Sequence, residues 1–201
     1  MKQDYPSDES YKAAAWMLMV EPRAMEAVAQ VEAGAYGAFL DSGEPVILFE
    51  RHKFDKWTGG RYRDKRVPNT ANGWGIISSP IPGGYGPVSV QHQRLAFAST
   101  LNRDAALKST SWGLFQILGE NHEAAGYPWL QRFINAMYRD VDDHLRAFVM
   151  FIRHDYRMVD ALRAKDWAEF ARLYNGPAYA RNRYDEKMAA AYIELGSTQN
   201  A

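Results

Sequence analysis

The chain has 201 residues, which is enough for one domain with a buried core. Hydrophobic residues make up 47% of it and charged residues 24%, a composition typical of globular proteins. The 24 basic side chains balance the 24 acidic ones, which argues against nucleic acid bound through a dominating basic surface. The absence of cysteine excludes disulfides and thiolate metal sites.

The N-terminal region contains one apolar run, Ala13 to Val20, far shorter than the roughly 20 residues that a membrane-spanning helix needs. Acidic residues at positions 4, 8 and 9 precede this run, which is unlike the basic start of a signal peptide. We therefore expect an amphipathic first helix capped by Ser7, with no membrane insertion. The protein is expected to be made in the cytoplasm and to need another route out of it.

A second helix is predicted to start at Pro22, because proline is favoured at the first helical position. Gly34 and Gly37 are expected to end it. The turn sequence "DSGEP" then separates two short apolar runs, at 38–40 and 46–49, a pattern that predicts a β-hairpin.

The segment from Arg51 to Pro87 is rich in Gly, Pro and Asn and is predicted to be a long ordered loop. Helices are expected again from Val90, with a clear apolar stripe at 141–152 and a capped start at Asp166. The predicted fold class is mainly α (α+β): several helices and one small β-hairpin, in a single domain over residues 1–201.

Glu32 is predicted to lie in the last turn of the second helix, where unpaired carbonyl groups carry a partial negative charge. That field, and any apolar surroundings, would raise the pKa of the carboxyl group and favour the neutral acid. A general acid needs this protonation state near neutral pH. The alternative is a solvated surface side chain.

Glu50 shares one face of the predicted second strand with Val46 and Leu48. It would either form a salt bridge with the basic residues at 51–53 or face a cleft opposite Glu32. Two carboxyl groups that flank a cleft are the chemical minimum for hydrolysis of a glycosidic bond. The sequence fixes neither their separation nor whether such a reaction retains or inverts configuration.

Two later motifs resemble those of enzymes that cleave peptidoglycan. The stretch "SWGLFQI" at 111–117 resembles the S-x-G-L-x-Q-I motif of goose-type lysozymes and soluble lytic transglycosylases, and "LYNGP" at 173–177 resembles their Y-N-x-G element. The closer likeness is to the N-acetylmuramidase family of bacteriophage endolysins. It is carried by "VEAGAYGAFLDSGEPVILFERHKF" at 31–54 and "YNGPAYARNRYDEKMAAAY" at 174–192, and it extends from about Val20 to Leu195.

This resemblance implies a lysozyme-like, α-rich fold, cleavage of the glycan backbone of peptidoglycan, and a general-acid role for Glu32. Ala33 stands where serine commonly follows the glutamate, so any help from that serine is missing. Many endolysins carry a separate wall-binding module, but none is visible in this sequence, so we expect a bare catalytic domain, and we expect no cofactor. We expect a monomer that reaches periplasmic peptidoglycan through a membrane pore.

A cleft that grips sugars needs amide, hydroxyl and aromatic groups. The candidates for polar contacts with the substrate are Ser111, Gln116, Tyr174 and Asn175. The candidates for stacking on sugar rings are Trp57, Trp74 and Tyr85. For the polar candidates the alternative is helix capping and hydrogen bonding within the core. Metal catalysis is not expected, because His144 and His154 are too far apart in the sequence to share a helix face as i, i+4 ligands would.

Three functions remain open from the sequence. The first is a muramidase that hydrolyses the β-1,4 bond between N-acetylmuramic acid and N-acetylglucosamine. The second is a lytic transglycosylase that cleaves the same bond and leaves a 1,6-anhydro end. The third is a glycan-binding module of the same fold without catalysis. The second carboxyl group, Glu50, favours hydrolysis, because a transglycosylase can work with the acid alone.

Overall fold

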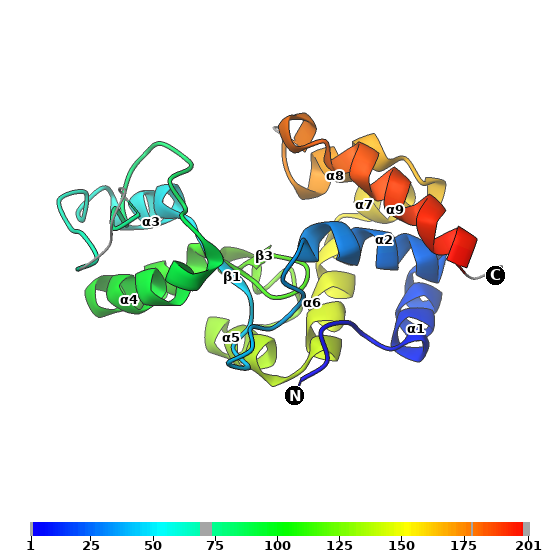
Figure 1. The fold of residues 1–201 in the computed structure, drawn as a ribbon, viewed down its shortest axis with the longest axis horizontal. Coiled ribbons are helices and arrows are strands. Elements are labelled where there is room, and N and C mark those ends of the chain that lie inside the picture. The colour runs from blue at the N-terminus through cyan, green and yellow to red at the C-terminus, as the bar shows by residue number, and fades with distance from the viewer. Residues whose placement is uncertain (1, 69–73, 178, 199–201) are drawn as a thin grey trace.

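The computed structural model describes residues 2–68, 74–177 and 179–198, and helices dominate it (Figure 1). The α-helices are α1 (Asp8–Leu18), α2 (Pro22–Ala33), α3 (Arg51–Thr58), α4 (Gln91–Lys108), α5 (Leu130–Arg139), α6 (Val141–His154), α7 (Tyr156–Ala164), α8 (Trp167–Tyr174) and α9 (Tyr184–Thr198). The strands are β1 (Ile47–Phe49), β2 (Thr110–Trp112) and β3 (Ile117–Leu118), and the 3-10 helices are η1 (Val88–Val90), η2 (Gly119–Asn121) and η3 (Tyr179–Asn182). The predicted mainly α fold is confirmed.

The small sheet differs from the predicted hairpin. The predicted turn forms, and the chain pairs across it through the Phe39–Pro45 bridge and through hydrogen bonds from Leu40 N to Glu44 O at 2.8 Å and from Val46 N to Ala38 O at 2.9 Å. The apolar run that follows, β1, pairs instead with β2 in antiparallel register, with Ile47 opposite Trp112. Strand β2 in turn pairs with β3, so the sheet order is β1-β2-β3. A local turn signal therefore found the bend and the short pairing across it, but not the strand that pairs with β1, which lies far along the chain.

The predicted loop at 51–87 is wrong over its first eight residues, because they form helix α3. Gly59, in the left-handed region at φ 60°, ends the helix. Asp55 of α3 then holds the loop that follows: Arg63 donates two hydrogen bonds of 2.7 Å to its carboxylate and Ser78 Oγ one of 2.8 Å. These contacts order the described parts of the loop on both sides of residues 69–73.

Helix α6 lies centrally in the fold and carries the predicted apolar stripe. Its residues Val141, Leu145, Phe148 and Ile152 are all buried. Phe148 stacks on Phe115 with ring centroids 4.2 Å apart. The core of the protein thus lies directly behind the segment that joins β2 to β3.

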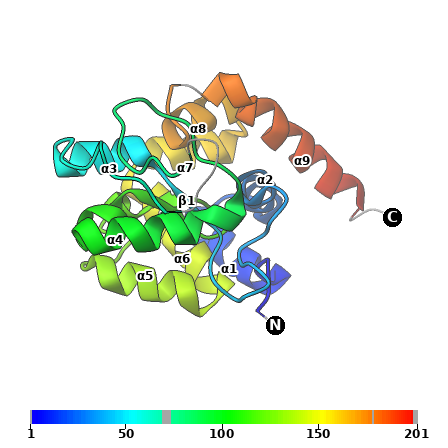
Figure 2. The same ribbon diagram turned by 60° about the vertical axis from the view of Figure 1, so that its left-hand side comes forward.

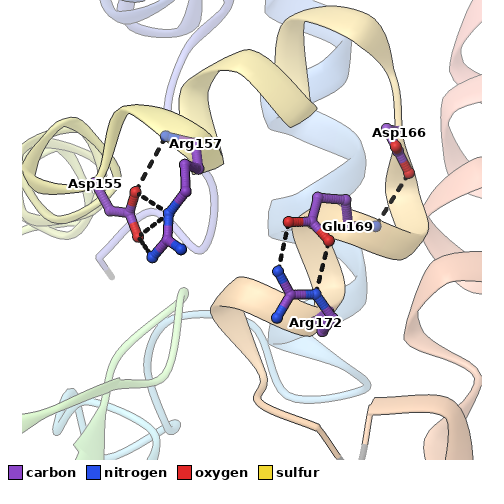
Figure 3. A network of polar contacts seen from close by, with 5 residues as sticks. All are labelled: Asp155, Arg157, Asp166, Glu169 and Arg172. Carbon is purple, nitrogen blue, oxygen red and sulfur yellow. Dashed lines mark hydrogen bonds and ion pairs between the residues drawn. The ribbon is translucent and has the colours of Figure 1, made fainter.

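Aspartates start the two helices after α6 (Figure 3). Asp155 caps α7 by accepting from Arg157 N, and its carboxylate also pairs with the Arg157 guanidinium. Asp166 accepts from Glu169 N at 3.0 Å, which confirms the predicted start of α8. Glu169 pairs with Arg172, one turn further on. The Asp166 cap fixes where α8 begins, and the last residue of that helix, Tyr174, donates to Phe115 O in the segment between β2 and β3.

Two groups of helices flank the sheet. Helix α9 packs along α2 and against α8 on one side, while α3 packs against α4 on the other (Figures 1 and 2). Within the described residues, none of the helices is both long and apolar enough to cross a membrane.

Candidate active site

A cavity of about 760 Å³ lies where the two groups of helices face each other, with the sheet at its base. Glu32 reaches it from the end of α2, and Glu50 reaches it from the junction of β1 and α3. The other sequence-predicted site residues also line it: Ser111, Gln116, Tyr174 and Asn175. The fold therefore brings all six candidates, which come from three separate stretches of sequence, to one concave surface.

Glu32 is the second-last residue of α2, as expected, and Gly34 ends the helix with φ 56°. The carboxyl group is largely removed from water, and burial raises its pKa to about 7. One hydrogen bond opposes this shift: Asn175 Nδ2 donates to Glu32 Oε1 at 2.8 Å. Glu32 can therefore hold a proton near neutral pH and still release it.

The pair at the end of α8 makes contacts to the protein itself. Tyr174 donates its hydroxyl hydrogen to Phe115 O at 2.7 Å, and its ring stacks on Phe170. Asn175 caps α8 and directs its amide at Glu32. Its Oδ1 is buried and has no hydrogen-bond partner among the described residues. Tyr174 thus fixes the base of the cavity and Asn175 fixes the acid, while the Asn175 oxygen remains able to accept a hydrogen bond.

Glu50 stands at the N-terminal end of α3. Ser111 Oγ donates to its Oε1 at 2.9 Å, and His52 Nε2 lies 3.6 Å from its Oε2. Burial raises the pKa of Glu50, but the Ser111 hydrogen bond and the nearby Lys53 ammonium oppose that effect. Burial also lowers the pKa of His52, which favours its neutral form.

The alternative of a structural salt bridge at Glu50 is met by His52 but not by the other two basic residues that follow it. Arg51 turns away and donates from Nε to Ile81 O at 3.2 Å. Lys53 pairs with Glu120 at 2.6 Å instead of with Glu50. Arg51 and Lys53 therefore do not pair with Glu50, and His52, which does lie within ion-pair distance, has a pKa that burial lowers.

The segment between β2 and β3 depends on a glycine and a buried histidine. Gly113 has φ 69°, and a Cβ there would come within 2.6 Å of the His144 ring. His144 Nδ1 accepts from Leu114 N at 3.0 Å, and its Nε2 lies 2.8 Å from Met137 O. Burial lowers the pKa of His144 to about 4, so the ring is neutral and donates from Nε2. His144, considered above as a metal ligand, supports this segment.

Gln116 belongs to the same segment and takes the left-handed conformation at φ 47°. Its side-chain amide donates to Gly113 O at 2.8 Å and to Val46 O at 3.3 Å. The side chain therefore joins the segment to the residue before β1 while it lines the cavity. Among the described residues, no group of three or more His, Asp or Glu side chains is arranged to hold a metal ion.

Tyr184 is a cavity residue that the sequence did not single out, since it reads as part of the apolar stripe of the last helix. It is the first residue of α9. Burial and the negative charges of Glu32 and Glu50 raise its pKa to about 12. Its phenol is therefore a neutral hydrogen-bond donor within electrostatic reach of both carboxyl groups. The signal available in the sequence was that Tyr184 lies in the same stretch, 174–192, as Tyr174 and Asn175.

The three aromatic candidates lie in different places. Tyr85 lines the cavity. Trp74 packs on Gly86, where a Cβ would meet the indole at 2.8 Å. Trp57 belongs to α3 and not to a loop, and 43% of it is exposed.

A helical fold with a small sheet and two unlike carboxyl groups in one cavity is that of the lysozyme-like enzymes. The sequence profile of the N-acetylmuramidase family matches residues 21–196, and the chain therefore belongs to this family. The crystal structure of the Burkholderia AP3 phage endolysin is similar, with a TM-score of 0.81 and 37% sequence identity. The match covers 98% of this chain and 73% of that one. The curated proteins gave no match.

Proposed function

We propose that the protein is a muramidase, which hydrolyses the β-1,4 bond between N-acetylmuramic acid and N-acetylglucosamine in the glycan strands of bacterial peptidoglycan. The observation that carries this proposal is the placement of Glu32 and Glu50 in one cavity, where burial raises the pKa of both and the Ser111 hydrogen bond and the Lys53 ammonium oppose that shift at Glu50. Membership of the N-acetylmuramidase family supports it, as does the similarity to a phage endolysin.

In the proposed mechanism Glu32 is the general acid. It transfers its proton to the glycosidic oxygen as the bond between that oxygen and the anomeric carbon breaks. Asn175 fixes the carboxyl group for this transfer, and a pKa of about 7 keeps the proton available. After the transfer, the same hydrogen bond stabilises the carboxylate that has formed.

Glu50 is the proposed carboxylate. As the leaving group departs, the sugar ring acquires positive charge, which a negative group in the cavity stabilises. Ser111 holds Glu50 Oε1 at 2.9 Å and so orients the other oxygen. Water completes the reaction: its oxygen bonds to the anomeric carbon, and its proton passes to a carboxylate. The separation of the two groups when substrate is bound decides between retention and inversion.

The products of digestion test the proposal. Purified peptidoglycan is incubated with the protein, and the soluble fragments are analysed by mass spectrometry. Reducing N-acetylmuramic acid ends are expected. Anhydro ends would instead show a lytic transglycosylase, and binding without any released fragment would show a glycan-binding module. The Glu32→Gln variant, digested in parallel, controls for contaminating hydrolases.

We also propose that the protein is made in the host cytoplasm and reaches periplasmic peptidoglycan through a pore that another protein forms. Its similarity to a phage endolysin supports this. Expression in a Gram-negative host should then leave cells intact until the inner membrane is permeabilised. Lysis on expression alone would contradict the proposal.

A further inference from the structure

Helix α3 leads away from the cavity, starting at Glu50. Lys53, on its first turn, lines the cavity, and Trp57 follows four residues later. Residues four apart lie on the same helix face, so Trp57 continues the wall that Lys53 begins. With 43% of its surface exposed, Trp57 presents a large apolar ring just beyond the cavity.

A carboxylate fixes the edge of this ring. Glu120, in η2, accepts from Trp57 Nε1 at 2.9 Å and from Lys53 Nζ at 2.6 Å. Burial disfavours the charge on Glu120, yet these two donors outweigh burial and hold its pKa below the usual value. The neighbouring Asn121 lines the cavity. One ionised side chain therefore ties the ring to two cavity residues.

A cation restricts the face of the ring. Lys108 Nζ lies 4.7 Å from the centroid of the Trp57 ring and is itself paired with Asp104 at 2.9 Å. Lys56 Nζ is further away, at 6.0 Å. Held at its edge by Glu120 and over one face by Lys108, the ring is preorganised, so little conformational freedom would be lost when a ligand stacks on it.

We propose that Trp57 forms a saccharide-binding subsite outside the cavity, which receives a further sugar of the glycan strand whose cleaved bond lies between Glu32 and Glu50. This inference rests on the proposed function. The sugar stacks its apolar face on the side of the ring that Lys108 leaves open. Glu120 is a positioning residue that acts through the ring. The subsite would make the enzyme prefer long glycan strands to short ones.

Another exposed tryptophan provides a matched control. Trp129 is 60% exposed, and the Arg132 guanidinium carbon lies 4.4 Å from its ring centroid. It precedes α5 and does not line the cavity. Exposure and a cation beside the ring are thus shared, while the connection to the cavity through Lys53 and Glu120 is not.

The experiment measures binding of defined peptidoglycan glycans by calorimetry in the inactive Glu32→Gln background, which prevents turnover. Trp57→Ala should weaken binding of an octasaccharide about tenfold and leave binding of a tetrasaccharide unchanged. Trp57→Phe, which keeps a ring, should restore part of the loss. Trp129→Ala should change neither affinity. Melting temperatures of all variants exclude misfolding as the cause.

Kinetics separate this inference from the proposed function. With Glu32 intact, Trp57→Ala should raise KM for long strands and leave kcat on the tetrasaccharide unchanged. Equal octasaccharide affinities of the Trp57→Ala variant and its parent would overturn the subsite alone. An unsubstituted protein that releases no fragments from peptidoglycan would overturn the proposed function.

Discussion

The two walls of the cavity hold the same kind of side chain at opposite ends of a helix. Glu32 lies in the last turn of α2, where the helix dipole is negative, and Glu50 lies just before the first turn of α3, where it is positive. A neutral amide is the hydrogen-bond donor to Glu32, whereas Glu50 has the Ser111 hydroxyl and the nearby Lys53 ammonium.

Burial acts on both groups and raises the pKa of each. Burial is the largest cause at both and is more complete at Glu32, while at Glu50 the Ser111 hydrogen bond and the Lys53 ammonium oppose it. We expect Glu50 to ionise at a lower pH than Glu32, with Lys53 favouring the charge and Glu120 opposing it. The polarity of the two helix ends therefore favours the proposed roles of Glu32 as acid and Glu50 as carboxylate.

The largest effect on activity is expected at Glu32, on the wall of the cavity that α2 forms. Glu32→Gln removes the transferable proton and should lower turnover of peptidoglycan by about 10²- to 10⁴-fold, with the fold retained. Glu26→Gln is the matched control, since Glu26 is a partly buried acid on the same helix that does not line the cavity. Near-normal turnover by a folded Glu32→Gln protein would remove Glu32 from the mechanism.

Glu50→Gln tests the opposite wall of the cavity, at the junction of β1 and α3, and should lower kcat/KM by about 10²-fold. A buried acid with a raised pKa makes the folded state less stable once it is charged, so the melting temperature at pH 7 should not fall. The unsubstituted enzyme should show a bell-shaped pH profile, whose upper limb near pH 7 reports Glu32. The variant should lose the lower limb. Early melting with normal turnover would instead assign Glu50 a structural role.

Tyr184 also lines the cavity. Removing its hydroxyl should lower kcat/KM less than replacing either glutamate. Tyr184→Phe deletes a neutral donor near the two carboxyl groups and should lower kcat/KM about tenfold. Tyr192→Phe on the same helix is the control, because the Tyr192 hydroxyl binds Glu21 and Arg23 and does not line the cavity. If the two variants have equal activity, the Tyr184 hydroxyl has no part in the reaction.

The last effect concerns the stability of the fold and not its activity, and the sign of this effect is informative. The pKa of Glu32 is about 7 in the folded protein against an ordinary 4.5, so the unfolded chain ionises first as pH rises. Stability is therefore lost between these values, by on the order of 3 kcal/mol above pH 7. Glu32→Gln should melt several degrees higher than the unsubstituted protein at pH 8, and this gain should vanish at pH 4. A gain independent of pH would show that ionisation is not its cause.

The position of Glu32 on α2 could be predicted from the sequence, because the residues that start and end this helix are close to it in the chain. Pro22 and Gly34 mark the two ends of α2 and thereby place Glu32 in its last turn. The surroundings of Glu50 could be predicted only in part, because helix α3, which begins directly after it, was not expected. The run 51–58 is strongly polar, and the contacts that stabilise α3, such as those of Asp55 with Arg63 and Ser78, arise only after folding.

Motifs identified residues that meet at the site but not what they contact. Ser111 and Asn175 are predicted to bind substrate, and the structure shows what the motifs did not, that each donates a hydrogen bond to a carboxyl group. Tyr184 was missed because its position depends on how α9 packs along α2. Distances between separate elements are set by tertiary packing, which no pattern within one segment encodes.

The histidine beneath the segment from β2 to β3 gives the protein an acid limit. His144 accepts the Leu114 amide hydrogen only while Nδ1 is unprotonated, and its pKa of about 4 lies well below the ordinary 6.5. The unfolded chain therefore binds a proton first, and stability falls as pH drops from 6.5 towards 4. Glu32 makes the opposite demand, since its charge destabilises the fold at higher pH. Between pH 4.5 and 6.5 the two changes run in opposite directions and largely offset each other, so together these groups leave the stability of the fold nearly independent of pH in the range in which the proposed acid still carries its proton.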